Sequence, residues 1–149
     1  MSQNAESPSA PKTRLYFIED EALLCDLFEE YVKTMPEIDY LGYSQDGAEA
    51  MRRCLELKPD MVVVDIRMPE VNGLEILTLL HRKLPGTKII LFTGTVDNES
   101  LRLAVRYGAD GYVEKTYGLE ELRKAIQVVL GGEKHYSPGI AKLLRNFKV

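Results

Sequence analysis

Side chains capable of chemistry follow four apolar runs in this chain. In chain order they are Glu19 and Asp20, Asp65, Thr93, and Lys115. Asp65 comes directly after Met61–Val64, a run that predicts a strand buried on both faces. A carboxylate in that place is costly unless it is solvated, paired or bound to a metal. Because ligand sites in open parallel sheets form at the carboxyl ends of strands, we expect Asp65 at the mouth of a pocket.

The segment that follows Asp65 predicts a rigid loop. Pro69 fixes its own φ and disfavours helical angles at Met68, and Gly73 lets the chain turn before an apolar helix begins. Taken alone, this pattern fits a reactive carboxylate and an Asp that only caps its loop equally well. The other strand ends favour the reactive carboxylate. In a parallel sheet all four ends meet at one edge, which gathers three carboxylates, a hydroxyl and an ammonium group.

This constellation resembles the receiver domain of two-component response regulators, over roughly Thr13 to Gly132. The identity, order and spacing of the motif residues are specific to that family. The resemblance implies that Asp65 is the phosphoacceptor and Lys115 the invariant lysine. It also implies that Thr93 is the switch hydroxyl and Tyr112 the aromatic switch residue. Phosphoryl transfer depends mainly on positioning and electrostatic stabilisation, and these residue types provide both.

The resemblance further implies a divalent cation, Mg²⁺ or Mn²⁺. Its expected ligands are the carboxylates of Glu19, Asp20 and Asp65 and the backbone carbonyl of Arg67. Oxygen ligands suit magnesium, and clustered carboxylates repel one another without a cation. Glu19 is a frequent variant of the commoner Asp. Gly94 is a departure from the family pattern, because most receivers have Ala after the switch hydroxyl; Gly keeps the site accessible but loosens the loop.

From the resemblance we expect a signalling protein and not an enzyme, one that catalyses only its own phosphorylation and dephosphorylation. The expected phosphodonor is a sensor histidine kinase. Phosphorylation would shift the domain between two packings, with Thr93 and Tyr112 as the moving parts. The fourth helix, the last strand and the fifth helix would form the surface for a phosphorylation-dependent homodimer or for an output domain. Stray apolar surface is an equally good explanation of the exposed apolar residues there.

Strand and helix patterns alternate along the chain, which predicts five βα units with right-handed crossovers. The strands are expected at Arg14–Ile18, Asp39–Ser44, Met61–Asp65, Lys88–Thr93 and Gly111–Lys115. The helices are expected at Ala22–Met35, Asp46–Leu57, Gly73–Lys83, Asn98–Gly108 and Leu119–Leu130. The predicted fold class is α/β, a doubly wound five-stranded parallel sheet. Its strand order, 2-1-3-4-5, is implied by the receiver resemblance.

Composition fits one soluble globular domain. The 149 residues are 45% hydrophobic and 28% charged with a net charge of −4, which gives no sign of a nucleic-acid-binding body. No stretch is long and apolar enough to span a membrane. Residues 1–12 predict a disordered tail, not a signal peptide, so we expect a cytoplasmic protein. Cys25 and Cys54 lie at apolar helix positions and are expected to be buried and reduced.

The end of the chain resembles the linker of NarL/FixJ-type regulators, which carry a LuxR-like helix-turn-helix domain after it. We therefore divide the chain into the tail, a receiver domain at 13–132 and a linker at 133–149, with Ser137 and Pro138 starting a short terminal helix. Because the chain stops at Val149, we expect a receiver separated from a transcriptional regulator, with DNA bound only through the absent output domain. A stand-alone receiver acting through protein contacts is the alternative, as is a degenerate receiver that signals without phosphorylation.

Two other protein classes share parts of this pattern. Phosphatases of the haloacid dehalogenase type usually have a second Asp two residues after the nucleophile, where this chain has Arg67. A flavodoxin-like cofactor binder needs a phosphate-cradling loop after the first strand. The corresponding loop here is Glu19-Asp20-Glu21, which repels an anion in the absence of a metal. Both alternatives are therefore weaker than the receiver.

Overall fold

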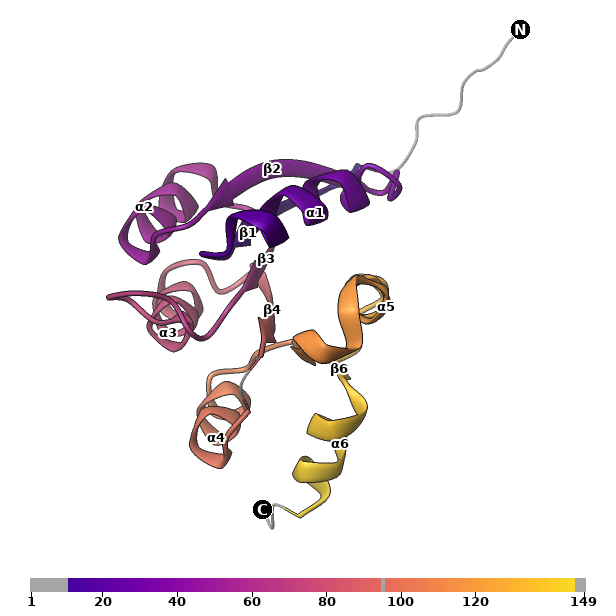
Figure 1. Cartoon of the computed structure of the whole chain (residues 1–149). Helices are drawn as coiled ribbons and strands as arrows, with labels where there is room; N and C mark the ends of the chain where they lie inside the picture. The colour runs from indigo at the N-terminus through magenta and orange to yellow at the C-terminus, as the bar shows by residue number, and fades with distance from the viewer. Residues whose placement is uncertain (1–10, 95, 147–149) are drawn as a thin grey trace, which may run out of the picture.

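The computed structural model describes residues 11–94 and 96–146. Within those ranges six parallel strands form one sheet in the order β2-β1-β3-β4-β5-β6. Figure 1 shows how the sheet and the helices are arranged. The strands are β1 (Thr13–Ile18), β2 (Ile38–Ser44), β3 (Met61–Val64), β4 (Lys88–Thr93), β5 (Gly111–Glu114) and β6 (His135–Tyr136). All four residues of β3 are fully buried, as expected for a central strand covered on both faces.

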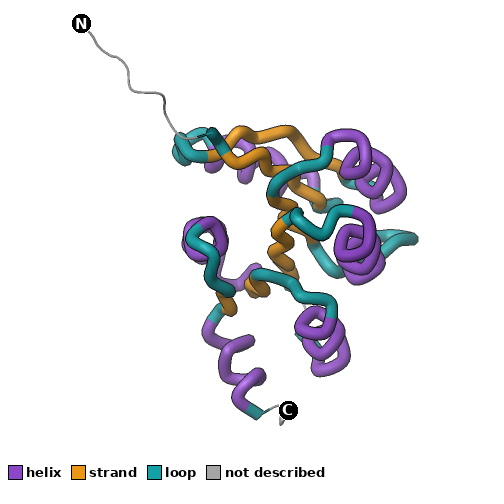
Figure 2. The backbone as a smooth tube through the Cα atoms, turned by 180° about the vertical axis from the view of Figure 1, so that it is seen from behind, coloured by secondary structure: helices purple, strands orange, loops and turns teal. Residues whose placement is uncertain are grey.

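Helices cover both faces of the sheet, as the two views in Figures 1 and 2 show. The α-helices of the described ranges are α1 (Ala22–Val32), α2 (Gly47–Leu57), α3 (Gly73–Lys83), α4 (Asn98–Arg106), α5 (Gly118–Leu130) and α6 (Pro138–Arg145). A 3₁₀ turn, η1 (Lys115–Tyr117), links β5 to α5. α1 and α5 lie on one face, and α2, α3 and α4 lie on the other.

Each face of the sheet has its own hydrophobic core. Phe28 of α1 stacks on Phe17 of β1 with ring centroids 4.3 Å apart in the core under α1 and α5. Cys25 belongs to this core, whereas Cys54 belongs to the core on the opposite face. Both cysteines are buried and free, as predicted, and the sheet between them accounts for the absence of a disulfide within the described residues.

The predicted fold class is confirmed, but the predicted number of strands is wrong. The five expected strands have the predicted order and differ from the observed bounds by at most one residue at either end. The described chain adds a sixth strand, β6, which pairs in parallel with β5. The sequence did not reveal β6 because two residues are too few to show the alternation of a strand. Residues 1–10 of the predicted tail lie outside the described ranges.

The segment from β6 to α6 packs on the sheet and does not extend away from it. His135 N donates to Asp110 O at 3.0 Å, and Ser137 N donates to Tyr112 O at 3.0 Å. Ile140 of α6 is fully buried, in the core that also contains Leu101 and Ala104 of α4. The expected short terminal helix is present, with Ser137 as its N-cap residue. Consequently β5, which was predicted to be the last strand, has β6 as its outer neighbour in the described sheet.

Trimming Ile140 tests how firmly this helix is docked. Ile140→Val removes one buried methyl group, so α6 should open more easily by about 1 kcal/mol. That difference corresponds to about fivefold faster amide hydrogen exchange in α6, if α6 opens as a local unit. The exposed Lys142 on the same helix gives the control Lys142→Ala, for which no such change is expected. Equal exchange in Ile140→Val and the native chain would show that Ile140 does not anchor the helix.

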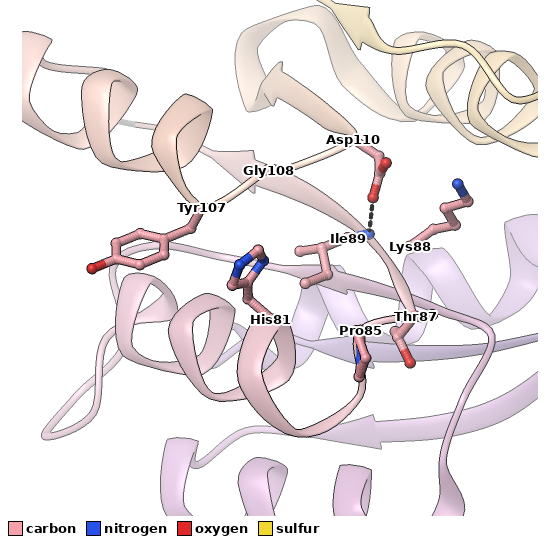
Figure 3. Close-up of a pocket in the computed structure, with 9 residues that line it drawn as sticks. His81, Pro85, Thr87, Lys88, Ile89, Tyr107, Gly108 and Asp110 are labelled. Carbon is pink, nitrogen blue, oxygen red and sulfur yellow. Dashed lines mark hydrogen bonds between the residues drawn. The ribbon is translucent and has the colours of Figure 1, made fainter.

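A hollow of about 250 Å³ lies at the amino-terminal end of β4, shown in Figure 3. His81 of α3 meets Tyr107 edge-on at its side, with ring centroids 6.0 Å apart. The Asp110 side chain accepts a hydrogen bond from Ile89 N at 2.9 Å and so ties the start of β5 to β4. This end of the sheet is opposite to the carboxyl edge, where ligand sites form in such folds.

None of the described helices combines the length and the apolar character needed to cross a membrane.

Candidate functional site

Asp65 begins the loop after β3 and its backbone is fixed by its neighbours. Its N–H donates to Ile18 O of β1 at 3.0 Å, and its side chain is almost fully buried. Arg67 N donates to Asp65 Oδ1 at 3.1 Å, so one carboxylate oxygen is oriented by the backbone of its own loop. Gly73 N donates to Ile66 O at 2.8 Å and closes the loop from its far end.

The start of α3 stabilises this loop. The Asn72 side chain accepts from Leu74 N and Glu75 N, and Glu75 Oε1 accepts from Asn72 N at 3.0 Å. This is a complete capping box, which satisfies otherwise unpaired N–H groups at the helix start. Gly73, the first residue of α3, lies so close to Asp65 that a Cβ built on it would be 2.2 Å from Asp65 O. The predicted rigid loop therefore depends on a close backbone approach.

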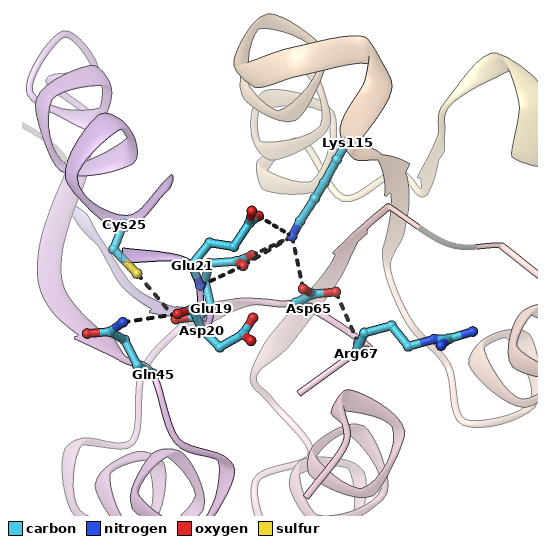
Figure 4. Close-up of polar contacts among 8 residues, drawn as sticks. All are labelled: Glu19, Asp20, Glu21, Cys25, Gln45, Asp65, Arg67 and Lys115. Carbon is cyan, nitrogen blue, oxygen red and sulfur yellow. Dashed lines mark hydrogen bonds and ion pairs between the residues drawn. The ribbon is translucent and has the colours of Figure 1, made fainter. Parts of the chain in front are cut away.

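Lys115 lies at the centre of the acidic site, as Figure 4 shows. Its Nζ is 2.9 Å from Asp65 Oδ2, 3.0 Å from Glu19 Oε1 and 3.2 Å from Glu21 Oε1. Burial alone would lower the pKa of Lys115, but hydrogen bonds to Asp65 and Glu19 outweigh it and raise that pKa. The ammonium group is therefore charged at neutral pH. It contacts Asp65 and Glu19, which precede Lys115 by 50 and 96 residues in the sequence.

Glu19 is the most deeply buried carboxylate of the site. Its side chain is 1% exposed, and burial followed by repulsion from Asp65 raises its pKa to about 7. Lys115 opposes this rise but does not cancel it. Glu19 Oε1 lies 3.0 Å from the Lys115 ammonium yet makes no hydrogen bond of good geometry to any described residue. An incompletely satisfied buried oxygen is costly, so the site can accept further positive charge.

Glu19, Asp20 and Asp65 form a group that suits a divalent cation. One carboxylate oxygen from each lies within 4.8 Å of the others. Asp20 is only partly buried, so the group is open to solvent on one side. Hard oxygen donors with room for water are what magnesium prefers. The predicted set of carboxylates is therefore brought together, and the unsatisfied oxygen of Glu19 favours a cation there.

The remaining predicted residues come from β4, from β5 and from the loop after β3. Thr93 is fully buried at the carboxyl end of β4, where it pairs in register with Glu114 of β5. Tyr112 is fully buried in β5, in the core that includes Leu101 and Ile140, and its hydroxyl has no hydrogen-bond partner among the described residues. Arg67 contributes a backbone N–H to Asp65, and its own side chain is exposed.

Comparison with known proteins identifies the family. A model of the response regulator receiver domain matches residues 15–127, which is most of the chain. The chain belongs to the response regulator receiver domain family. A curated relative, the response regulator protein VraR of Staphylococcus aureus, is 26% identical over 133 residues. That match covers 89% of this chain and 64% of the relative, so the chain spans less than two thirds of the relative's length.

Solved structures agree with this assignment. A LuxR-family two-component response regulator from Aurantimonas sp. SI85-9A1 superimposes with a TM-score of 0.82 at 27% identity, covering 88% of this chain and 94% of the other. A LuxR-family DNA-binding response regulator from Staphylococcus aureus has a TM-score of 0.73 at 30% identity, covering 77% and 96%. The receiver fold derived above is thus shared along most of the chain.

Three contacts of this receiver site were not predicted from the sequence. Glu21 reaches Lys115, Gln45 Nε2 donates to Asp20 O at 3.0 Å, and Cys25 Sγ donates to Glu19 O at 3.3 Å. In the sequence, Glu21 could be recognised only as part of an acidic loop. Its position directly after the acidic pair was the available signal, but no sequence pattern indicates which way an exposed side chain points.

The glycine after Thr93 offers a test of the loop in this receiver. A Cβ on Gly94 would lie 3.9 Å from Lys115 Cδ, an ordinary contact, and Gly94 does not have a positive φ. Gly94→Ala should therefore raise the free energy of unfolding by about 0.4–1 kcal/mol, because it restricts the unfolded chain without straining the folded one. Denaturant unfolding measures this change. A clear loss of stability would show that the loop needs a conformation only glycine adopts.

Proposed function

We propose that this receiver accepts a phosphoryl group on Asp65. The observation that carries the proposal is the 2.9 Å contact between Lys115 Nζ and Asp65 Oδ2, beside two further carboxylates at the carboxyl edge of the sheet. A nucleophilic carboxylate, an adjacent cation and a cation-binding acidic pair are the parts that phosphoryl transfer needs.

In the proposed reaction an Asp65 carboxylate oxygen attacks phosphorus, and the bond between phosphorus and the donor's leaving group breaks. The product is an aspartyl phosphate. Arg67 N holds Oδ1 of the nucleophile at 3.1 Å and so limits its rotation. Lys115 begins the reaction paired with Asp65 and neutralises charge on the transferred group. This self-phosphorylation, and the hydrolysis of the aspartyl phosphate by water to Asp65 and inorganic phosphate, are the only catalysis that we assign to the chain.

Glu19, Asp20 and Asp65 would hold Mg²⁺ or Mn²⁺, together with the backbone carbonyl of Arg67. The bound cation would neutralise charge on the phosphoryl oxygens and on the three carboxylates. The raised pKa of Glu19 reflects first its burial and second its repulsion from Asp65. The affinity of the site for a cation therefore derives from relief of this repulsion as well as from direct coordination.

Thr93 and Tyr112 are proposed as the residues that transmit phosphorylation. Thr93 ends β4, which pairs with β3, the strand that leads to Asp65. A contact between the Thr93 hydroxyl and the phosphoryl group would therefore displace the β4–α4 loop. The side chain of Tyr112, a residue of β5, lies in the same core as Leu101 of α4 and Ile140 of α6. A shift of that loop would thus reach both the α4 surface and the C-terminal segment.

We further propose a sensor histidine kinase as the physiological donor, acting in the cytoplasm, because receiver domains of response regulators pair with such kinases. The solved structures of LuxR-family response regulators suggest transcription as the output, through a DNA-binding domain that is not among the described residues. Dimerisation or output contacts would use α4, α5 and the β5–β6–α6 region between them. The boundary between receiver and linker at residue 132 stays a prediction, although residues 135–145 contribute to the sheet and core.

Intact-mass spectrometry with a small-molecule phosphodonor tests this function. Incubation with acetyl phosphate and Mg²⁺ should add the mass of one phosphoryl group, and replacing Mg²⁺ by EDTA should prevent the addition. Hydroxylamine should remove the group, because it cleaves acyl phosphates and leaves phosphate esters of Ser, Thr and Tyr intact. No mass increase, under conditions where an active receiver is modified, would reject phosphorylation as the function of the site.

A further inference from the structure

Lys115 has three carboxylate neighbours that differ in exposure. The side chains of Glu19 and Asp65 are 1% and 4% exposed, whereas that of Glu21 is 64% exposed. The ammonium group is therefore enclosed on the sides of the two buried carboxylates. Glu21 lies on the exposed side, with its Oε1 3.2 Å from Lys115 Nζ. This contact is one of those marked in Figure 4.

The backbone of Glu21 is fixed, whereas its carboxylate is not needed for the helix that follows. Glu21 is the N-cap residue of α1, yet its side chain makes no capping hydrogen bond. Its N–H donates to Glu19 Oε2 at 3.1 Å, and its carbonyl accepts from Cys25 N at 3.0 Å. Ser, Thr, Asp and Asn are the usual capping residues, so a Glu here has no evident local role. What remains for the carboxylate is its contact with Lys115.

We propose that Glu21 is a positioning residue that limits phosphorylation by competing with the phosphoryl group for Lys115. This inference rests on the proposed function of Asp65. An incoming phosphoryl oxygen has to replace a carboxylate at the ammonium group, and the exposed one is the neighbour that can leave by rotating into water. Until it leaves, its negative charge also repels an anionic donor at the mouth of the site.

The charge-neutral isostere Glu21→Gln therefore accelerates phosphorylation. Glu19 and Asp65 still hold Lys115 in this variant, so the site keeps its cation. We expect a rate with acetyl phosphate that is about three- to tenfold higher at low ionic strength, in line with the charge effects on association rates at focused sites. The difference should shrink as salt is added, because an exposed charge is screened. A purely structural role would give no such salt dependence.

The experiment compares four proteins at saturating Mg²⁺: the native chain, Glu21→Gln, Glu21→Asp and Asp26→Asn. Asp26 is also exposed on α1, so Asp26→Asn is a matched control for the change in net charge, with a rate expected to equal that of the native chain. Glu21→Asp keeps the charge and should stay slow. Titration calorimetry with Mg²⁺ alone should give an equal or lower affinity for Glu21→Gln than for the native chain, because the substitution removes a negative charge beside the acidic group. A faster reaction of Glu21→Gln then cannot come from tighter binding of the cation.

The outcomes distinguish the two proposals. If the native chain is phosphorylated and Glu21→Gln reacts at the same rate or more slowly, the role of Glu21 is overturned and the phosphoacceptor function stays intact. An equal gain in Asp26→Asn would overturn it as well, because the effect would then reflect net charge alone. If neither the native chain nor Glu21→Gln gained a phosphoryl group, the proposed function itself would fail.

Discussion

Asp65→Asn is expected to abolish phosphoryl incorporation completely while leaving the fold intact. Asn has the same shape as Asp, and its amide oxygen can still accept from Arg67 N. The amide is not nucleophilic, and the variant also loses one of three carboxylates of the cation group. Intact mass after treatment with acetyl phosphate and Mg²⁺ should therefore stay at the value of the unmodified protein.

The matched control for this substitution is Asp39→Asn. Asp39 is an exposed residue of β2, so the change has the same shape and charge but lies outside the acidic site. Its phosphorylation should equal that of the native chain, and circular dichroism should be alike for all three proteins. A phosphoryl group on Asp65→Asn would place the phosphoacceptor elsewhere and would contradict the role assigned to Lys115.

Gly73→Ala is expected to cause the largest loss of stability among single-methyl changes at the site. The added Cβ would lie 2.2 Å from Asp65 O and 2.7 Å from Ile66 Cα, and both are backbone atoms that cannot rotate away. Overpacking of this kind typically costs about 1–3 kcal/mol and occasionally more. We expect a cost of about 3 kcal/mol in denaturant unfolding, with slower phosphorylation because relief of the overlap displaces the Asp65 backbone.

Gly86→Ala provides the control for the chemistry of the substitution. Gly86 is exposed between α3 and β4, a Cβ there would meet no atom within 4 Å, and its φ is not positive. The same added methyl group should therefore be neutral or stabilising by up to about 1 kcal/mol. Similar stabilities for the two variants would show that the approach of Gly73 to Asp65 is looser than 2.2 Å implies.

The sequence was enough to predict which residues meet at the site, because their places after buried strands are visible as local patterns. Buried strands show as apolar runs, and the parallel arrangement sends the residues after each run to one edge. Asp65 and Lys115 could therefore be placed together although they are 50 residues apart, and the structure puts their charged groups 2.9 Å apart. The bounds of five strands followed from the same patterns to within one residue, whereas their order was implied by the receiver resemblance.

The sequence alone determined the fold class and the composition of the acidic site, whereas the tertiary structure decided distances, burial and the uses of individual atoms. Only the structure brings Glu21 to Lys115, because the direction of an exposed side chain depends on partners distant in sequence. Only the structure shows that Gly73 is required by contact with Asp65 and not by a left-handed turn. The structure also adds β6 to the sheet, because a two-residue strand is recognised only by its pairing with a neighbouring strand, here β5.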